Sequence, residues 1–212
     1  MAAVATTLAL TVATTLATYY ARSMTVGILL VDPQLDFFPG GALGVDDGFA
    51  IVAPLNAWLR AHRDAPVYAS RDWHPEGTRH FKARGGIWPP HCVQGTSGAE
   101  FHSDLDLTRA RVYDKGTNPE DDGGYSAFDG VRSDASGART LLDDLKHDGV
   151  STLVVGGLAT DYCVKASVMD ALKHGFTVHL LRPGVRAVNL QPGDGDIAIA
   201  HMVQAGAVVV DA

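Results

Sequence analysis

The chain has 212 residues, 46% of them hydrophobic, which is enough apolar material for the packed core of one large α/β unit. Its formal net charge of −7 argues against a nucleic-acid binder, because such proteins carry a basic patch or stripe. Two cysteines do not make a disulfide framework, so the predicted compartment is a reducing cytoplasm.

Residues 1–23 differ in composition from the rest of the chain. They are rich in Ala, Thr, Leu and Val, and the first charge, Arg22, comes only after the apolar run. A signal peptide would begin with basic residues, and the run is too short and too rich in Thr for a membrane span. We interpret residues 1–23 as a disordered leader or a mis-assigned start, in preference to an export signal or a membrane anchor. Residues 24–212 are predicted to form one domain.

From residue 25 on, strand-like and helix-like segments alternate. In chain order the pattern predicts a strand over 25–31, a helix over 49–61, strands over 66–70 and 111–115, a helix over 137–147, a strand over 151–156, a helix over 161–174, a strand over 176–181, a helix over 194–204 and a strand over 207–210. Strict alternation of this kind predicts a doubly wound α/β fold. We expect a mainly parallel six-stranded sheet between two layers of helices.

Residues 71–94 contain a candidate metal site. Asp72 and His74 follow the second predicted strand and are two residues apart, so both side chains can point to the same side. The Gly- and Pro-rich segment that follows allows His91 to return to the same point. One carboxylate and two imidazoles suit Zn²⁺, Fe²⁺ or Mn²⁺ with coordination positions left open. The neighbouring Cys92 is expected to point away and to pack as an ordinary thiol.

A second group of reactive side chains follows the other strands. Cys163 lies just after the strand over 151–156, near the start of a helix, where backbone N–H groups favour a thiolate and can hold an oxyanion. Asp32 follows the first strand and can accept the thiol proton, and Lys115 ends the third strand and can lower the pKa of the thiol. Ligands bind outside the carboxyl ends of the strands in such sheets, so these residues and the metal set should meet at one edge.

Each of these residues also has an ordinary interpretation. A cysteine early in a helix is usually a small buried hydrophobe, and an aspartate before proline is usually a turn residue. Their common placement at one sheet edge is what favours function. The remaining histidines carry no spacing signal and are expected to be solvated or hydrogen-bonded: His80, His102, His147, His174, His179 and His201. A nucleotide-binding module is disfavoured, because no strand is followed by a glycine-rich phosphate loop.

The motifs resemble the nicotinamidase branch of the isochorismatase-like cysteine hydrolase family. The resemblance begins at about Met24, and its segments are VDPQLDFFPGGAL (31–43), RDWHP (71–75), WPPHCVQGT (88–96), DKGT (114–117), YSAF (125–128) and GLATDYCV (157–164). The Asp and Cys motifs are shared by the wider family. The Asp-x-His pair and the His-Cys-Val-Gln run indicate the nicotinamidase branch.

The resemblance implies roles for individual residues. They are a catalytic triad of Asp32, Lys115 and Cys163, metal ligands Asp72, His74 and His91, a cis peptide at Leu158–Ala159 that shapes the oxyanion hole, and aromatic walls at Phe37 and Trp88 with Tyr125 bordering the pocket. One divalent ion is expected, with Zn²⁺ ahead of Fe²⁺ and Mn²⁺. The implied reaction is hydrolysis of nicotinamide, and of pyrazinamide, to the acid and ammonia through a thioester, in NAD salvage.

Other readings stay open within the same fold. The substrate could be another small amide, such as a maleamate, an N-carbamoyl compound or biuret. A vinyl-ether isochorismatase is disfavoured, because those enzymes are expected to lack the cysteine. The implied partner is a small molecule, with no nucleic acid and no membrane, and the family allows a homo-oligomer.

Overall fold

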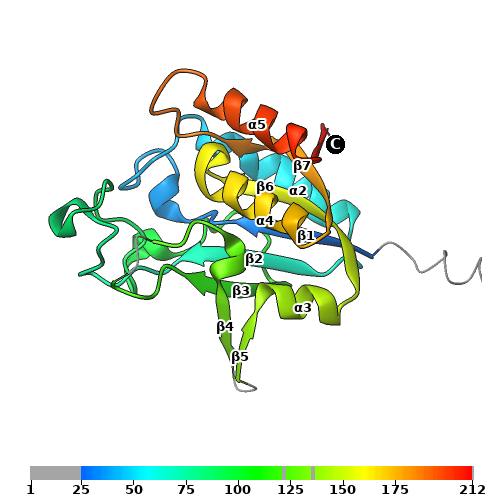
Figure 1. The fold of residues 1–212 in the computed structure, drawn as a ribbon, viewed down its shortest axis with the longest axis horizontal. Coiled ribbons are helices and arrows are strands. Elements are labelled where there is room, and N and C mark those ends of the chain that lie inside the picture. The colour runs from blue at the N-terminus through cyan, green and yellow to red at the C-terminus, as the bar shows by residue number, and fades with distance from the viewer. Residues whose placement is uncertain (1–24, 121–122, 135–136, 212) are drawn as a thin grey trace, which may run out of the picture.

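A single twisted sheet forms the centre of the molecule (Figure 1). The computed structural model describes residues 25–120, 123–134 and 137–211, so the prediction for residues 1–23 lies outside the described part. The order of its eight strands is β5-β4-β3-β2-β1-β6-β7-β8. The six predicted strands are all present as parallel strands: β1 (Thr25–Val31), β2 (Val67–Asp72), β3 (Ala110–Lys115), β6 (Val150–Leu158), β7 (Thr177–Arg186) and β8 (Val208–Val210).

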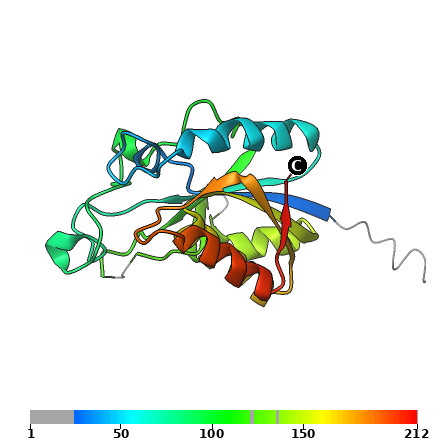
Figure 2. The same cartoon turned by 90° about the horizontal axis from the view of Figure 1, so that it is seen from above.

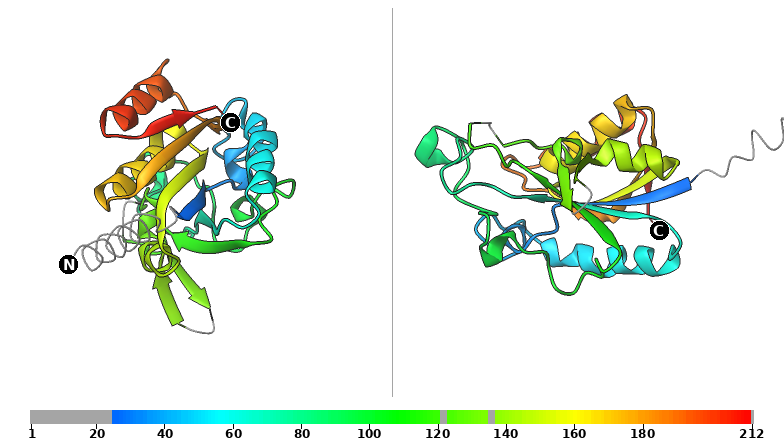
Figure 3. Two further views of the ribbon diagram at one scale, coloured as in Figure 1. Left: turned by 90° about the vertical axis from the view of Figure 1, so that its right-hand side faces the viewer. Right: turned by 90° about the horizontal axis from the view of Figure 1, so that it is seen from below.

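Two further strands were not predicted. β4 (Val131–Asp134) and β5 (Gly137–Thr140) form an antiparallel hairpin that extends from the β3 edge of the sheet (Figures 1 and 3). The prediction of a helix over 137–147 was therefore wrong at its start. Gly137 has a φ of +109°, which a helix does not tolerate, and a capping box between Thr140 and Asp143 starts the helix at Leu141 instead.

The helices cover both faces of the sheet, as predicted. Figure 2 shows α2 (Val52–Ala61) on one face and α3 (Leu141–His147), α4 (Lys165–Lys173) and α5 (Asp194–Gln204) on the other. Short 3-10 turns join these elements: η1 (Leu35–Phe37), η2 (Gly48–Ile51), η3 (Lys82–Arg84), η4 (Ser97–Ala99) and η5 (Ala127–Asp129). Across the described ranges, no helix is long and apolar enough to cross a membrane.

Alternation along the central strand divides the core into two layers. In β1, Ile28 and Leu30 pack on the α2 side, whereas Leu29 and Val31 pack on the side of α3, α4 and α5. All four side chains are at least 98% buried. A strand buried on both faces holds its end firmly in place, and the end of β1 is where Asp32 begins the candidate site.

A buried carboxylate ties the hairpin to α3. Asp144 is fully buried, accepts a hydrogen bond of 2.6 Å from the Tyr113 hydroxyl, and has Nε of Arg139 at 3.1 Å and Nε of Arg132 at 3.5 Å. We expect Asp144→Ala to lower the free energy of unfolding by about 3 kcal/mol, because the cations and the phenol lose their buried partner. Urea denaturation measures this.

The matched control is Asp64→Ala, because Asp64 is exposed and forms no ion pair among the described residues. Its free energy of unfolding should stay within about 0.5 kcal/mol of the unsubstituted chain. Equal losses in the two variants would show that the Asp144 network contributes no net stability.

Candidate functional site

The polar residues predicted at the strand ends meet at one edge of the sheet. Asp32 follows β1, Asp72 ends β2, Lys115 ends β3, and Ala159 follows β6. β1, β2, β3 and β6 are parallel neighbours, so their carboxyl ends open on the same side. Gly157 has a φ of +127°, and a Cβ there would lie 2.0 Å from the carbonyl oxygen of Val31, so β6 can approach β1 this closely only with glycine.

Lys115 lies at the centre of the candidate catalytic group. Its ammonium is fully enclosed, 3.0 Å from Asp32 Oδ2 and 3.5 Å from Cys163 Sγ, and it also binds Asp72 Oδ1. The other oxygen of Asp32 accepts a 2.7 Å hydrogen bond from the Ser70 hydroxyl. The Lys115 ammonium thus connects Asp32, Cys163 and the candidate metal ligand Asp72.

Burial sets the protonation of this group. It raises the pKa of the Asp32 carboxyl to about 6, although the Lys115 charge pulls the pKa down. It also raises the pKa of the Cys163 thiol well above its ordinary value, and here Lys115 opposes the rise without overcoming it. Lys115 therefore acts in the predicted direction, but burial, which was not predicted, outweighs it. At neutral pH the sulfur keeps its proton, and Asp32 is positioned as its acceptor.

Cys163 lies in a π-helical turn rather than in the regular helix that was predicted. The turn spans Thr160–Val164, directly before α4, and the Ala159 carbonyl accepts hydrogen bonds from the N–H groups of Tyr162 and Val164. Single π turns of this kind are frequent at functional sites. The Leu158–Ala159 peptide bond is cis. The turn brings the Cys163 thiol beside Lys115 and leaves it 6% exposed at the cavity.

The candidate metal ligands form a buried cluster beside Lys115. Asp72 Oδ2 lies 3.5 Å from His74 Nε2 and 3.9 Å from His91 Nε2. The Nδ1 atoms of the two imidazoles face the carbonyl oxygens of Gly116 and Pro89, at 3.1 and 2.8 Å, which directs both Nε2 lone pairs inward. His74 Nε2 is buried without a hydrogen-bond partner, as expected of an atom that binds a metal.

Protonation in this cluster also suits a metal. Burial lowers the pKa of His91 to about 4, so the imidazole is neutral, the form that binds metals. Burial acts to raise the pKa of Asp72, but the Lys115 charge and the two imidazoles together outweigh it and lower the pKa, which keeps the carboxylate ionised. The donor set therefore fits a divalent cation.

Sequence reasoning missed one member of the cluster. His80 is 5% exposed. One ring nitrogen from each of His74, His80 and His91 lies within 4.8 Å of the other two. The sequence held no signal for His80, because the five residues between His74 and His80 belong to an irregular loop without periodicity. Gly116 makes room for this packing, since a Cβ there would lie 2.4 Å from the His74 ring.

Two side chains that were not predicted to belong to the site, Gln34 and Asp36, hold the backbone of the candidate metal ligands in place. The Gln34 amide pairs with both backbone groups of Asp72, accepting from its N–H and donating to its carbonyl, each at 2.7 Å. Asp36 accepts a 2.7 Å hydrogen bond from the Cys92 N–H, and Cys92 has a φ of +45°. These contacts fix the backbone of Asp72 and the residue after His91. The Cys92 side chain itself is buried in the α2-side core, as its ordinary interpretation predicted.

We expect Gln34→Leu to weaken zinc affinity by about 10- to 100-fold, because buried backbone groups of Asp72 lose their partners and the carboxylate loses its fixed position. Competition with a chromogenic chelator measures the dissociation constant. Gln204→Leu is the control, since Gln204 is exposed at the end of α5. Equal zinc affinity in Gln34→Leu and the control would contradict a positioning role.

Aromatic side chains enclose the space between the thiol and the histidines. The cavity is about 20 Å³ and is lined by Phe37, Leu43, Asp72, His80, Trp88, His91, Tyr125, Ala159, Tyr162, Cys163 and Val188. All three predicted aromatics are among them, and Tyr162 and Val188 were not predicted. Trp88 Nε1 donates a 3.0 Å hydrogen bond to the Tyr125 hydroxyl, and Trp88 packs edge-on against Tyr162 with centroids 5.0 Å apart. The site suits a small flat substrate.

Known proteins are similar to this chain in sequence and in fold. The chain is 40% identical over 200 residues to the nicotinamidase of Escherichia coli strain K12, covering 85% of this chain and 92% of that protein. The pyrazinamidase of Pyrococcus horikoshii, solved in complex with zinc, has a TM-score of 0.78 and 41% identity, covering 88% of this chain and 98% of that one. PnC1 from L. infantum, in complex with nicotinate, has a TM-score of 0.75 and 38% identity over 89% of this chain and 93% of that one.

The family model described as the isochorismatase domain matches residues 26–212. This range contains every residue of the candidate site, from Asp32 to Val188. The match, together with the relatives above, shows that the chain belongs to the isochorismatase family.

Proposed function

We propose that the protein is a metal-dependent cysteine amidohydrolase that converts nicotinamide to nicotinate and ammonia, and that it also accepts pyrazinamide. The observation that carries this proposal is the contact of Lys115 with both Asp32 and Cys163 beside a histidine-lined aromatic cavity. The relatives named above include a nicotinamidase that is 40% identical to this chain and a pyrazinamidase that is 41% identical.

The first step joins the proton acceptor and the nucleophile. Asp32, ionised at neutral pH, takes the proton from Cys163 Sγ, and the Lys115 ammonium stabilises the thiolate as it forms. The sulfur attacks the amide carbon, and the carbonyl π electrons move to the oxygen. The N–H groups of Ala159 and Cys163, on the cis peptide and the π turn, are proposed to hold that oxyanion.

The remaining steps return the proton and release the product. Protonated Asp32 gives its proton to the leaving nitrogen, the C–N bond breaks, and ammonia leaves a thioester on Cys163. A water molecule that gives its proton to Asp32 then attacks the thioester carbon. The C–S bond then breaks, Asp32 returns the proton to the sulfur to regenerate the thiol, and the acid product ionises in water to nicotinate.

The ring of the substrate would be held by the aromatic walls. Phe37, Trp88 and Tyr125 offer apolar faces around the cavity, which suits a flat pyridine ring. Asp72, His74 and His91, with His80 as a further candidate, would hold one divalent ion, for which we propose Zn²⁺. Such an ion supplies a Lewis acid that anchors and polarises the heteroaromatic ring.

The residues that line the cavity favour nicotinamide over an anionic alternative such as a maleamate. A maleamate carries a carboxylate, which a binding site usually pairs with an arginine. Among the described residues that line the cavity none is an arginine. A neutral amide therefore suits this site better than an anionic one.

Ammonia release from purified protein tests the proposal. The protein is assayed with nicotinamide, pyrazinamide, maleamate and biuret after loading with Zn²⁺. We expect turnover of nicotinamide and pyrazinamide and little of the other two. Turnover of maleamate or biuret without nicotinamide would refute the substrate assignment while leaving the triad in place.

The compartment and the assembly state remain predictions. Both cysteines are free thiols in the structure, which suits the proposed reducing cytoplasm. Light scattering of the purified protein would test for a homo-oligomer.

A further inference from the structure

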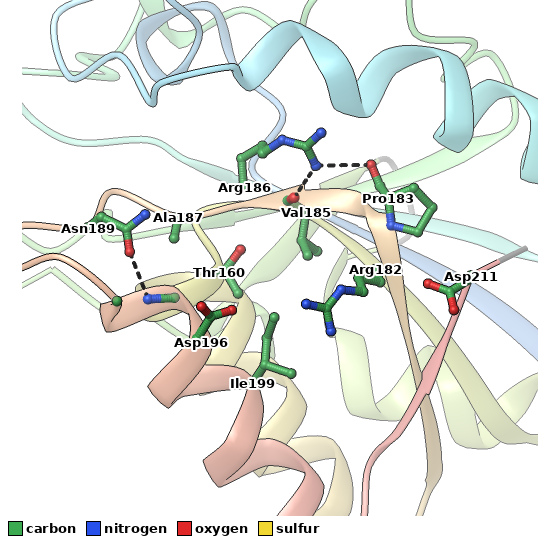
Figure 4. A pocket seen from close by; sticks show the side chains of 12 residues that line it. Thr160, Arg182, Pro183, Val185, Arg186, Ala187, Asn189, Asp196, Ile199 and Asp211 are labelled. Atoms are coloured by element: carbon green, nitrogen blue, oxygen red, sulfur yellow. Dashed lines mark hydrogen bonds between the residues drawn. The ribbon is translucent and has the colours of Figure 1, made fainter.

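A second, larger cleft lies behind one wall of the catalytic cavity. It has a volume of about 480 Å³, in the range of small-molecule sites, and lies between β7 and α5 (Figure 4). It forms because the register of β7 against β6 shifts: Val155 pairs with Leu180, but Gly157 pairs with Val185. The extra residues of β7 bulge, and the space between the bulge and the helix opens to solvent.

The charges around this cleft are not paired with each other. Arg182 extends from the bulge into the cleft, Asp196 faces it from α5, and Asp211 lies on the other side of the arginine (Figure 4). Within the part of the chain that the structure describes, none of the three forms an ion pair or a side-chain hydrogen bond. Arg186 differs, since its guanidinium points to the opposite face of β7 and binds Asp47 and backbone carbonyls.

The rest of the lining is a buried hydroxyl and apolar carbon. Thr160 is 2% exposed and has its side chain at the cleft, while Val185 and Ile199 form apolar walls. One guanidinium between two carboxylates presents both signs of charge, so it complements a ligand that carries both. We propose that the cleft binds a free α-amino acid with an apolar side chain, its carboxylate on Arg182 and its ammonium on Asp196.

The cleft and the catalytic cavity share a wall. Asp161, two residues before Cys163, accepts hydrogen bonds of 2.9 Å from the N–H groups of Val188 and Asn189. Val188 lines the catalytic cavity, and Asn189 lines the cleft and has a φ of +52°. A ligand in the cleft therefore lies against the segment whose other side faces the substrate.

This arrangement predicts the direction of the coupling. The catalytic cavity, at about 20 Å³, has room for only one or two water molecules, so its wall must move outward to admit a pyridine ring. A ligand in the cleft lies behind Asn189 and opposes an outward movement of the wall at Val188. The bound amino acid should therefore raise KM for nicotinamide with kcat nearly unchanged. This part of the inference rests on the proposed function, whereas the binding itself does not.

Binding is tested by calorimetry on the full chain with L-valine, L-leucine and L-phenylalanine, and with isocaproate and isoamylamine, which each lack one charge of leucine. We expect saturable binding of at least one amino acid, and binding of the two single-charge probes weaker by about tenfold or more. Arg182→Gln and Asp196→Asn should each weaken amino-acid binding by a similar factor. Arg60→Gln, an exposed arginine on α2 that removes the same charge, should not.

Three results would overturn the site. They are no saturable binding of any of the three amino acids, equal binding of the single-charge probes, and binding that Arg182→Gln leaves unchanged. In steady-state assays the bound amino acid should raise KM by about fivefold or more, and Arg182→Gln should remove the effect. Binding without a change in KM would overturn the coupling alone. A protein that binds the amino acid but does not hydrolyse nicotinamide would refute the proposed function and leave the binding site standing.

Discussion

Replacing the nucleophile should abolish turnover while the substrate still binds. In Cys163→Ala we expect kcat for nicotinamide to fall on the order of 10⁴- to 10⁶-fold, the range seen when a catalytic nucleophile is removed. The ring contacts of Phe37 and Trp88 and the histidine cluster do not involve the sulfur, so the dissociation constant should change little. Initial rates of ammonia release and calorimetric titration with nicotinamide measure the two quantities.

The second cysteine provides the control. Cys92 is buried in the α2-side core and is separate from the cavity lining, so Cys92→Ala should lose stability, by about 1 kcal/mol, but keep most of its turnover. The variant also keeps the sulfur of Cys163, so a mass shift that matches a trapped acyl-enzyme should appear in it and be absent from Cys163→Ala. Turnover retained in Cys163→Ala would rule out the covalent mechanism.

Removing the metal, or one of its ligands, should have the second-largest effect. We expect chelation, or His91→Ala, to lower kcat/KM by about 100-fold or more, because a Lewis acid contributes several kcal/mol and the substrate loses an anchor. Added Zn²⁺ should restore the chelated protein fully and the variant only in part. Metal content by elemental analysis must follow activity in the same samples.

Two further measurements separate the metal from the triad. His201→Ala, an exposed histidine on α5, should keep both metal and activity. The Cys163 thiol should still react with a small alkylating agent in His91→Ala, since Lys115 and Asp32 contact it independently of that imidazole. Activity that survives complete removal of the metal would mean that the cluster of Asp72 and the histidines has a structural role.

The sequence determined the class of fold and most of the site. All six parallel strands were predicted from apolar runs of strand length between segments of helical spacing. This works because the order of apolar and polar residues along the chain reflects which positions are buried. The rule that the carboxyl ends of parallel strands share an edge then brought Asp32, Asp72 and Lys115 together. Both inferences need only the local pattern and the direction of each strand.

Other features arose only from tertiary contacts. The hairpin of β4 and β5 replaced part of a predicted helix because a glycine at positive φ and a capping box moved the helix start to Leu141. His80 joined the histidine cluster through an irregular loop, for which no periodicity exists. The Gln34 amide hydrogen-bonds to the backbone of Asp72, 38 positions away, and no local sequence pattern predicts a contact over that separation.

The protonation of Cys163 shows the same division. The sequence placed a thiol, a lysine and a carboxylate at one edge, and from these types alone the lysine was expected to acidify the sulfur. Only the three-dimensional structure showed that the thiol is almost completely buried, and desolvation disfavours its charged form more than one cation favours it. Residue types decide which chemistry is available, whereas packing decides the dielectric environment and therefore where the proton resides.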